Sequence, residues 1–175
     1  MTSEKQRLEI GALNQFAEAL VPVLGEGRFT FDRLLKPPEP DALCSFDGEL
    51  LHVEVAHVYG TQSDVKKLLG RTGKSAPTQA QQMLSARVPL NACPGTDGRL
   101  LRLLTPLNDL LSDKATKKYQ TSRVWLLVRS AFPLWSVVDF VGNQACIAVP
   151  VEHPFEKIWL LCGPRASFGL LQLYP

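Results

Sequence analysis

Two acidic residues, Asp41 and Glu54, stand where they could hold a divalent cation. Asp41 follows Pro40 at the start of a predicted strand, and Glu54 lies thirteen residues later inside an apolar run over residues 50–58. An acid at the start of one strand and an acid in the middle of the next can meet across a hairpin. Carboxylate oxygens are hard ligands of the kind that divalent cations such as Ca2+ and Mg2+ prefer in proteins. The pair therefore predicts a site for a divalent cation.

This arrangement resembles the PD-(D/E)XK nuclease superfamily, whose signature is Pro-Asp, a short β-turn-β unit and then acid-X-Lys. Pro40, Asp41 and Glu54 match the signature, but Ala56 stands where the signature has lysine. The resemblance implies a restriction-endonuclease-like fold, DNA as the partner, Mg2+ or Mn2+ as the metal ion, and metal-dependent hydrolysis of phosphodiester bonds. The signature lysine helps to position the attacking water and to stabilise charge on the phosphate, so here that cation must come from elsewhere or be absent.

The helix expected after Pro106 offers a replacement for this lysine. In the superfamily the lysine can migrate from the strand to a neighbouring helix, and Lys118 follows Leu111 by seven residues, on the predicted core-facing side. Lys118 is therefore the leading catalytic candidate, ahead of Lys114 and Lys117. The ordinary alternative is a lysine near a helix end that extends past the core to water.

Glu9 is the candidate third acid of the site. It continues the apolar stripe of the first predicted helix instead of its charged side. Because an inward-facing acid needs a partner or a function, we expect Glu9 to be an auxiliary metal ligand, although an acid is also favourable near the positive end of a helix. On the strand, His52 shares a face with Glu54, whereas His57 points to the opposite face and cannot simply replace the lysine.

The predicted elements form an α/β fold with a mixed central sheet flanked by helices, in the manner of the restriction-endonuclease-like core. The Asp-Gly turn at positions 47 and 48, between two apolar runs, is a strong hairpin signal. The predicted helices cover residues 3–21, 105–119 and 134–141, and the predicted strands cover 28–35, 42–46, 49–59, 123–128, 157–162 and 170–174.

The composition fits a single domain over residues 1–175, with 45% hydrophobic and 21% charged residues. An irregular segment at about 61–98 contains a short predicted helix at 63–69. Residues 70–75 look like a phosphate-binding loop, but Leu68 stands where that pattern requires its first glycine, so nucleotide binding is not expected.

The charge, the cysteines and the hydropathy of the sequence predict where the protein is located and what it can bind. The net charge of +2 is compatible with nucleic-acid binding but does not require it. The first residues are polar and no apolar stretch reaches the roughly 18 residues needed to span a bilayer, which favours a soluble cytoplasmic protein without a membrane partner. Without a Cys-x-x-Cys pair, the cysteines are expected to be free thiols: Cys44, Cys93, Cys146 and Cys162.

Two other functions stay open. The same fold could serve as a catalytically silent binding or accessory protein, of the immunity type, in which Ala56 marks the loss of chemistry. Alternatively, the apolar closing strands at 158–161 and 170–173 could form a homodimer edge, or bind another protein, without any metal.

Overall fold

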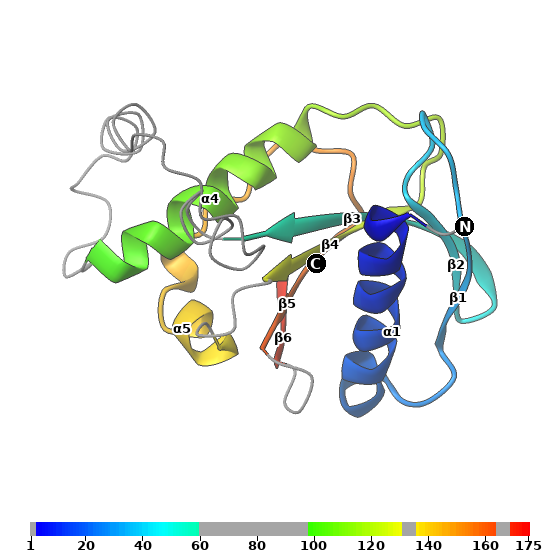
Figure 1. The fold of residues 1–175 in the computed structure, drawn as a ribbon, viewed down its shortest axis with the longest axis horizontal. Helices are drawn as coiled ribbons and strands as arrows, with labels where there is room; N and C mark the ends of the chain where they lie inside the picture. Colours follow the sequence, from blue (N-terminus) through cyan, green and yellow to red (C-terminus); the bar gives the residue numbers. More distant parts are fainter. Residues whose placement is uncertain (1–2, 60–97, 131–135, 164–168) are drawn as a thin grey trace.

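The chain folds as an α/β protein around one six-stranded mixed sheet (Figure 1). The computed structural model describes residues 3–59, 98–130, 136–163 and 169–175. Predictions for residues 60–97 therefore lie outside the described residues, as do Cys93 and the first part of the helix predicted at 134–141. The predicted fold class is confirmed at the level of an α/β protein with a mixed sheet and helices.

The strands lie in the sheet in the order of the chain. They are β1 (Phe29–Leu34), β2 (Ala42–Phe46), β3 (Glu49–Val58), β4 (Val124–Ser130), β5 (Lys157–Cys162) and β6 (Gly169–Tyr174). Strands β1 to β3 pair antiparallel, β3 to β5 pair parallel, and β6 returns antiparallel to β5. All six predicted strands are confirmed, with ends that differ by at most two residues, because alternating or continuous apolar runs mark buried strands clearly.

The hairpin between β2 and β3 is fixed by its turn. Asp47 has a φ of 55° and Gly48 a φ of 79°, so both central residues adopt the left-handed conformation of a type I′ turn. Arg28 Nε donates to Asp47 Oδ1 at 2.5 Å, which ties the turn to the start of β1. The register that follows pairs Ala42 with Val53.

Helix α1 (Glu4–Leu24) starts as predicted and ends later than predicted. Ser3 caps the first turn, and the Gln6 side chain accepts a hydrogen bond from the Ser3 backbone in return. Pro22 lies inside the helix, where it removes only one backbone hydrogen bond of the last turn. The helix stops at Gly25, whose φ of 94° few other residues can adopt.

Helix α4 (Gly98–Ala115) differs from the prediction at both ends. It begins before Thr105, because leucines on both sides of Pro106 continue the helical pattern, and it contains this proline. It ends before Tyr119, because Thr116 N–H and Oγ1 both donate to the carbonyl of Asp113, at 3.3 and 2.7 Å. A short helix α5 (Val137–Val141) and a 3-10 turn η1 (Gln144–Cys146) follow β4.

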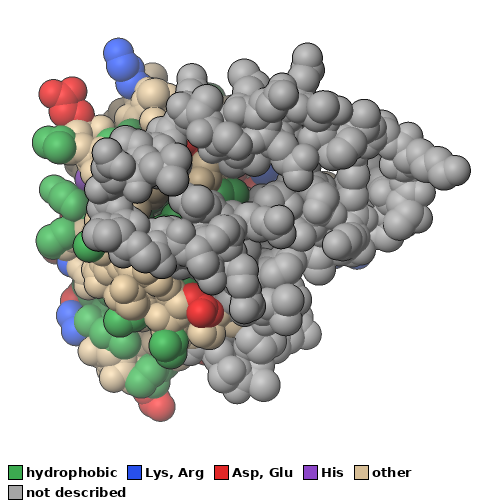
Figure 2. Space-filling view, turned by 90° about the vertical axis from the view of Figure 1, so that its left-hand side faces the viewer, with side chains coloured by type: hydrophobic (Ala, Val, Ile, Leu, Met, Phe, Trp, Pro, Cys, Tyr) green, Lys and Arg blue, Asp and Glu red, His purple; other side chains and the backbone are tan. Residues whose placement is uncertain are grey.

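On the face shown in Figure 2, the described part of the surface carries separate acidic and basic side chains among hydrophobic ones, without a continuous basic band. None of the helices in the described residues is both long and apolar enough to cross a membrane. Cys44 and Cys162 are buried free thiols, as predicted. Cys146 is disulfide-bonded, so the prediction of free thiols is wrong there, because spacing along the sequence does not show which cysteines the fold brings together.

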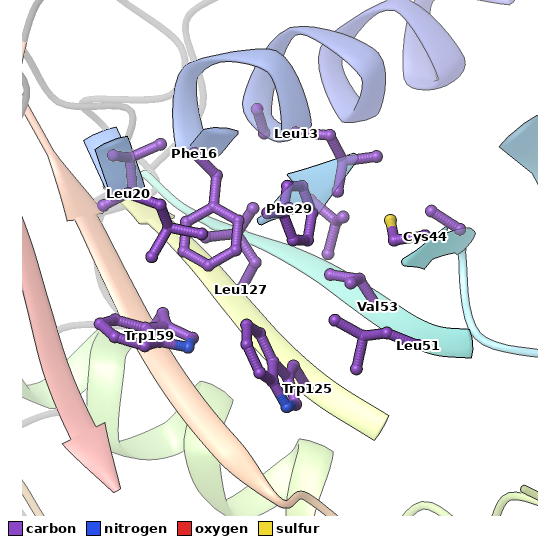
Figure 3. Close-up of a cluster of buried hydrophobic side chains, with 14 residues drawn as sticks. Leu13, Phe16, Leu20, Phe29, Cys44, Leu51, Val53, Trp125, Leu127 and Trp159 are labelled. Carbon is purple, nitrogen blue, oxygen red and sulfur yellow. The ribbon is translucent and has the colours of Figure 1, made fainter. Parts of the chain in front are cut away.

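A hydrophobic core lies on each face of the sheet, and side chains of β3 contribute to both because they point alternately to the two faces. Val53 and Val55 face α1, in a core where Phe16 contacts Trp125 and Trp159 at ring-centre distances of 6.4 and 5.8 Å (Figure 3). Ala56 and Val58 belong to the second core, with Leu107 and Leu111 of α4 and Phe140 of α5. Glu54 therefore points towards the α4 side of the sheet.

Candidate active site

The hairpin brings the Asp41 side chain onto the strand that carries Glu54. Asp41 is one residue before Ala42, which pairs with Val53, so it lies opposite the β3 position of Glu54. Asp41 Oδ2 accepts a hydrogen bond from the backbone N–H of Val55 at 3.0 Å. The side chain is thus held against the middle of β3. That Asp41 and Glu54 share a cation stays a prediction.

Helix α1 places Glu9 at the same end of the hairpin. Glu9 is buried, with 5% of its surface exposed, as expected for an inward-facing acid. Lys5 Nζ lies 3.0 Å from Glu9 Oε1 and 3.3 Å from Asp41 Oδ1, so one ammonium bridges both carboxylates. Burial raises the pKa of Glu9, and the neighbouring negative charge of Asp41 raises it further, against the opposing effect of Lys5. Glu9 and Asp41 therefore share one counter-ion, the ammonium of Lys5.

Glu54 is paired with a lysine from α4. Lys114 Nζ lies 2.5 Å from Glu54 Oε1, and both side chains are largely buried, at 21% and 9% exposure. This lysine comes from helix α4, whereas position 56 of β3 holds alanine. Lys114 follows Leu107 by seven residues and Leu111 by three, which places it beside the buried leucines within the helix.

Lys118, the leading candidate from the sequence, is not in this position. It is exposed and lies beyond the end of α4 at Ala115, so the helical spacing from Leu111 does not extend to it. Lys117 is exposed as well. The prediction of a helix-borne lysine beside Glu54 is therefore corrected from Lys118 to Lys114.

Tyr119 also belongs to this site and was missed from the sequence. Its hydroxyl oxygen is buried without a hydrogen-bond partner of good geometry, and its ring packs 6.1 Å from that of Phe155. Burial raises the pKa of Tyr119, and the nearby Glu54 charge raises it further. Helix α4 ends at Ala115, so Tyr119 lies in the loop that follows it. A prediction of this helix end would have been needed to place Tyr119 near Glu54.

The two histidines of β3 lie on opposite faces, as the strand alternation predicts. His52 Nδ1 lies 3.2 Å from Thr121 Oγ1, which describes an ordinary hydrogen-bonded strand histidine. His57 lies on the α1 side and stacks on Tyr59, with ring centres 5.8 Å apart. Burial, aided by the positive charge of Arg129, lowers the pKa of His57 to about 4.

The donor set suits a hard cation in type and charge, but it is not a ready-made metal site. In the part of the chain that the structure describes, no three His, Cys, Asp or Glu side chains are grouped to hold a metal ion. The acids form two ion-paired groups: Lys5 of α1 pairs with Glu9 and Asp41, and Lys114 of α4 pairs with Glu54. Buried Glu9 Oε1 has its ion pair but no well-oriented hydrogen bond. Because Glu9 and Asp41 share one ammonium, a further positive charge would fit this pair of acids.

Fold and site together define an α/β protein with two groups of ion-paired acids and lysines beside β2 and β3, one reached from α1 and one from α4. No protein-family model, curated protein or solved structure matches this chain. Its function is therefore inferred from the geometry and chemistry of the site.

Proposed function

We propose that this protein hydrolyses phosphodiester bonds in DNA with Mg2+ or Mn2+, on a restriction-endonuclease-like fold of the PD-(D/E)XK type. The order of α1, β1, β2, β3, α4 and β4, with an antiparallel β1–β3 unit and a parallel β3–β4 pair, supports this fold. The positions of Asp41 before β2 and of Glu54 in the middle of β3 agree with the motif.

The contact between Lys114 and Glu54 carries the proposal. Position 56 of β3 holds alanine, and the ammonium of Lys114 reaches Glu54 from α4 instead, at 2.5 Å. A lysine kept largely out of water needs a compensating interaction, which Glu54 supplies. An acid on the strand that pairs with an ammonium from a neighbouring helix, where the strand itself carries no lysine at position 56, is what a migrated catalytic lysine requires.

The ion-paired acids and Lys114 each have a role in this proposal. Asp41 and Glu54 would hold the metal ion, with Glu9 as the auxiliary ligand, and a bound ion would activate water and neutralise phosphate charge. Lys114 orients the Glu54 carboxylate and offers N–H donors to the negative charge that develops on the phosphate.

Cleavage of DNA by paired lysine variants tests the proposal. We expect Lys114→Ala to slow Mg2+- or Mn2+-dependent cleavage of plasmid DNA by at least about 100-fold, since removal of one donor to developing charge typically has an effect of this size. Lys118→Ala removes an exposed lysine four residues away and should cleave like the wild type. Equal cleavage by the wild type and Lys114→Ala would contradict the role of Lys114.

A silent binding protein is the second candidate. It is favoured by the internal ion pairs of Glu9, Asp41 and Glu54 and by the lack of a ready three-ligand group among the described residues. Calorimetric titration with Mn2+ separates the candidates. A nuclease should bind Mn2+ and lose this binding in Asp41→Asn and Glu54→Gln, because each change removes an anionic ligand. A silent protein should neither bind Mn2+ through these acids nor cleave DNA.

A further inference from the structure

We propose that Lys5 is a built-in counter-ion, which occupies the cation position between Glu9 and Asp41 and which a divalent ion must displace. This inference rests on the metal-dependent function proposed above. It assigns to Lys5 a role opposite to that of Lys114: Lys5 competes with the metal ion, whereas Lys114 assists the reaction.

The contacts of Lys5 are those of a bound cation. Its single ammonium lies 3.0 Å from Glu9 Oε1 and 3.3 Å from Asp41 Oδ1, and so it joins two carboxylates from elements far apart in the sequence. Both carboxylates are shielded from water, at 6% and 17% exposure. Two such acids repel each other unless a positive charge lies between them.

Lys5 and Lys114 differ in how easily each can leave its carboxylate partners. The Lys5 side chain is 75% exposed, whereas that of Lys114 is 21% exposed. An exposed ammonium regains full hydration when it swings away, and an exposed ion pair is worth little, so its displacement has a low cost. A buried ammonium would lose its compensation. Lys5 is thus the replaceable cation.

The charge of this pair of acids favours the exchange. Glu9 and Asp41 carry two negative charges when both are ionised, and the ammonium of Lys5 compensates one of them. A divalent ion in the place of this ammonium would compensate both and leave no uncompensated charge in a poorly hydrated site.

The fold also allows Lys5 to move without loss of the helix. The first turn of α1 is held by the capping box of Ser3 and Gln6, in which Lys5 has no part. Glu9 sits one turn further along, in the buried part of the helix. The acids therefore stay in place when the ammonium departs.

The test is the Mn2+ affinity of Lys5→Met, measured by calorimetry at about pH 8, where carboxylates are ionised. Methionine keeps the length and helix propensity of lysine and removes its charge. We expect Mn2+ to bind about tenfold more tightly than to the wild type, since a competing charge is gone. Arg7→Met removes an exposed positive charge from the same helical turn and should leave the affinity within about twofold, since exposed charges are screened.

Lys5→Arg completes the design, because it keeps the charge and should bind Mn2+ no more tightly than the wild type. Thermal melting of each variant verifies that the fold is retained. Equal or weaker Mn2+ binding by Lys5→Met would overturn the role of Lys5 while the metal-dependent function stands. Equal tightening by Arg7→Met would also overturn it, because general charge would then explain the effect. Absence of Mn2+ binding in every protein would overturn both proposals.

Discussion

Ala56 has the same orientation on β3 as Glu54, and its small side chain is packed in the core between β3 and α4. Lys114 can therefore reach Glu54 because position 56 carries no long side chain that would compete for this carboxylate. This dependence of one lysine on one alanine makes the site sensitive to substitution at position 56.

The first prediction follows from this competition. We expect Ala56→Lys to lower the free energy of unfolding by about 1–3 kcal/mol, because the larger side chain overpacks the core and a second ammonium joins Lys114 beside Glu54. The free energies of unfolding are measured in urea for the wild type, Ala56→Lys, Lys114→Ala and the double variant. The double variant should be more stable than the sum of the single effects indicates. Simple additivity would show that the two positions do not share Glu54.

The second prediction concerns His57. Because burial lowers its pKa from 6.5 to about 4 in the folded protein, the unfolded chain takes up a proton first as the pH falls. The stabilising contribution of neutral His57 is therefore complete above about pH 6.5 and is lost progressively down to about pH 4, by about 3 kcal/mol at most.

His57→Phe provides the measurement, since it keeps a ring against Tyr59 and removes the titrating group. Its free energy of unfolding, from urea titrations over this pH range, should depend less steeply on pH than that of the wild type. Identical slopes would rule out a contribution from His57.

Among the elements, the β2–β3 hairpin depends on its turn, and this gives a third prediction. Gly48→Ala should destabilise the protein by about 1 kcal/mol, because alanine at a φ of 79° is strained. Gly11→Ala is the matched control. Gly11 lies in α1 with open space around its Cα, so alanine there should stabilise by about 0.5–1 kcal/mol. Thermal unfolding should thus shift in opposite directions, and a stabilising Gly48→Ala would refute the turn assignment.

The elements also show how far the sequence could be interpreted. The strands and the hairpin were predictable because apolar runs and an Asp-Gly turn are local signals, and Asp41 and Glu54 could be located from them. Glu9 could be located from the apolar stripe of the first helix. The lysine could not, because its identity depends on the last turn of α4. Thr116 ends that helix through a hydrogen bond that no periodicity reveals, so the choice between Lys114 and Lys118 required the structure.

At the scale of the whole molecule, the two hydrophobic cores lie on opposite faces of one sheet and share its strands. Because adjacent residues of β3, β4 and β5 face opposite cores, the loss of either core should remove the support of the other. The fourth prediction is that Phe16→Ala and Leu111→Ala, one from each core, lower stability by about 3–5 and 2–5 kcal/mol.

Both variants should still unfold in a single transition, with far-ultraviolet circular dichroism and tryptophan fluorescence changing together in urea. Val138→Ala, at a side chain that is 73% exposed, should change stability by less than about 0.5 kcal/mol. Separate transitions in either core variant would mean that the two layers fold independently.

The order of the strands in the sheet has a consequence for protein synthesis. Within the described residues, each strand pairs only with its neighbours in the chain, so none of these later strands has to be inserted between two earlier ones. As the ribosome releases the chain, each new strand can extend a sheet that already exists, starting from the β1–β3 meander. Until β6 arrives, the apolar edge of β5 stays open, and a nascent chain stalled at that stage would present it to chaperones or to other unfinished copies.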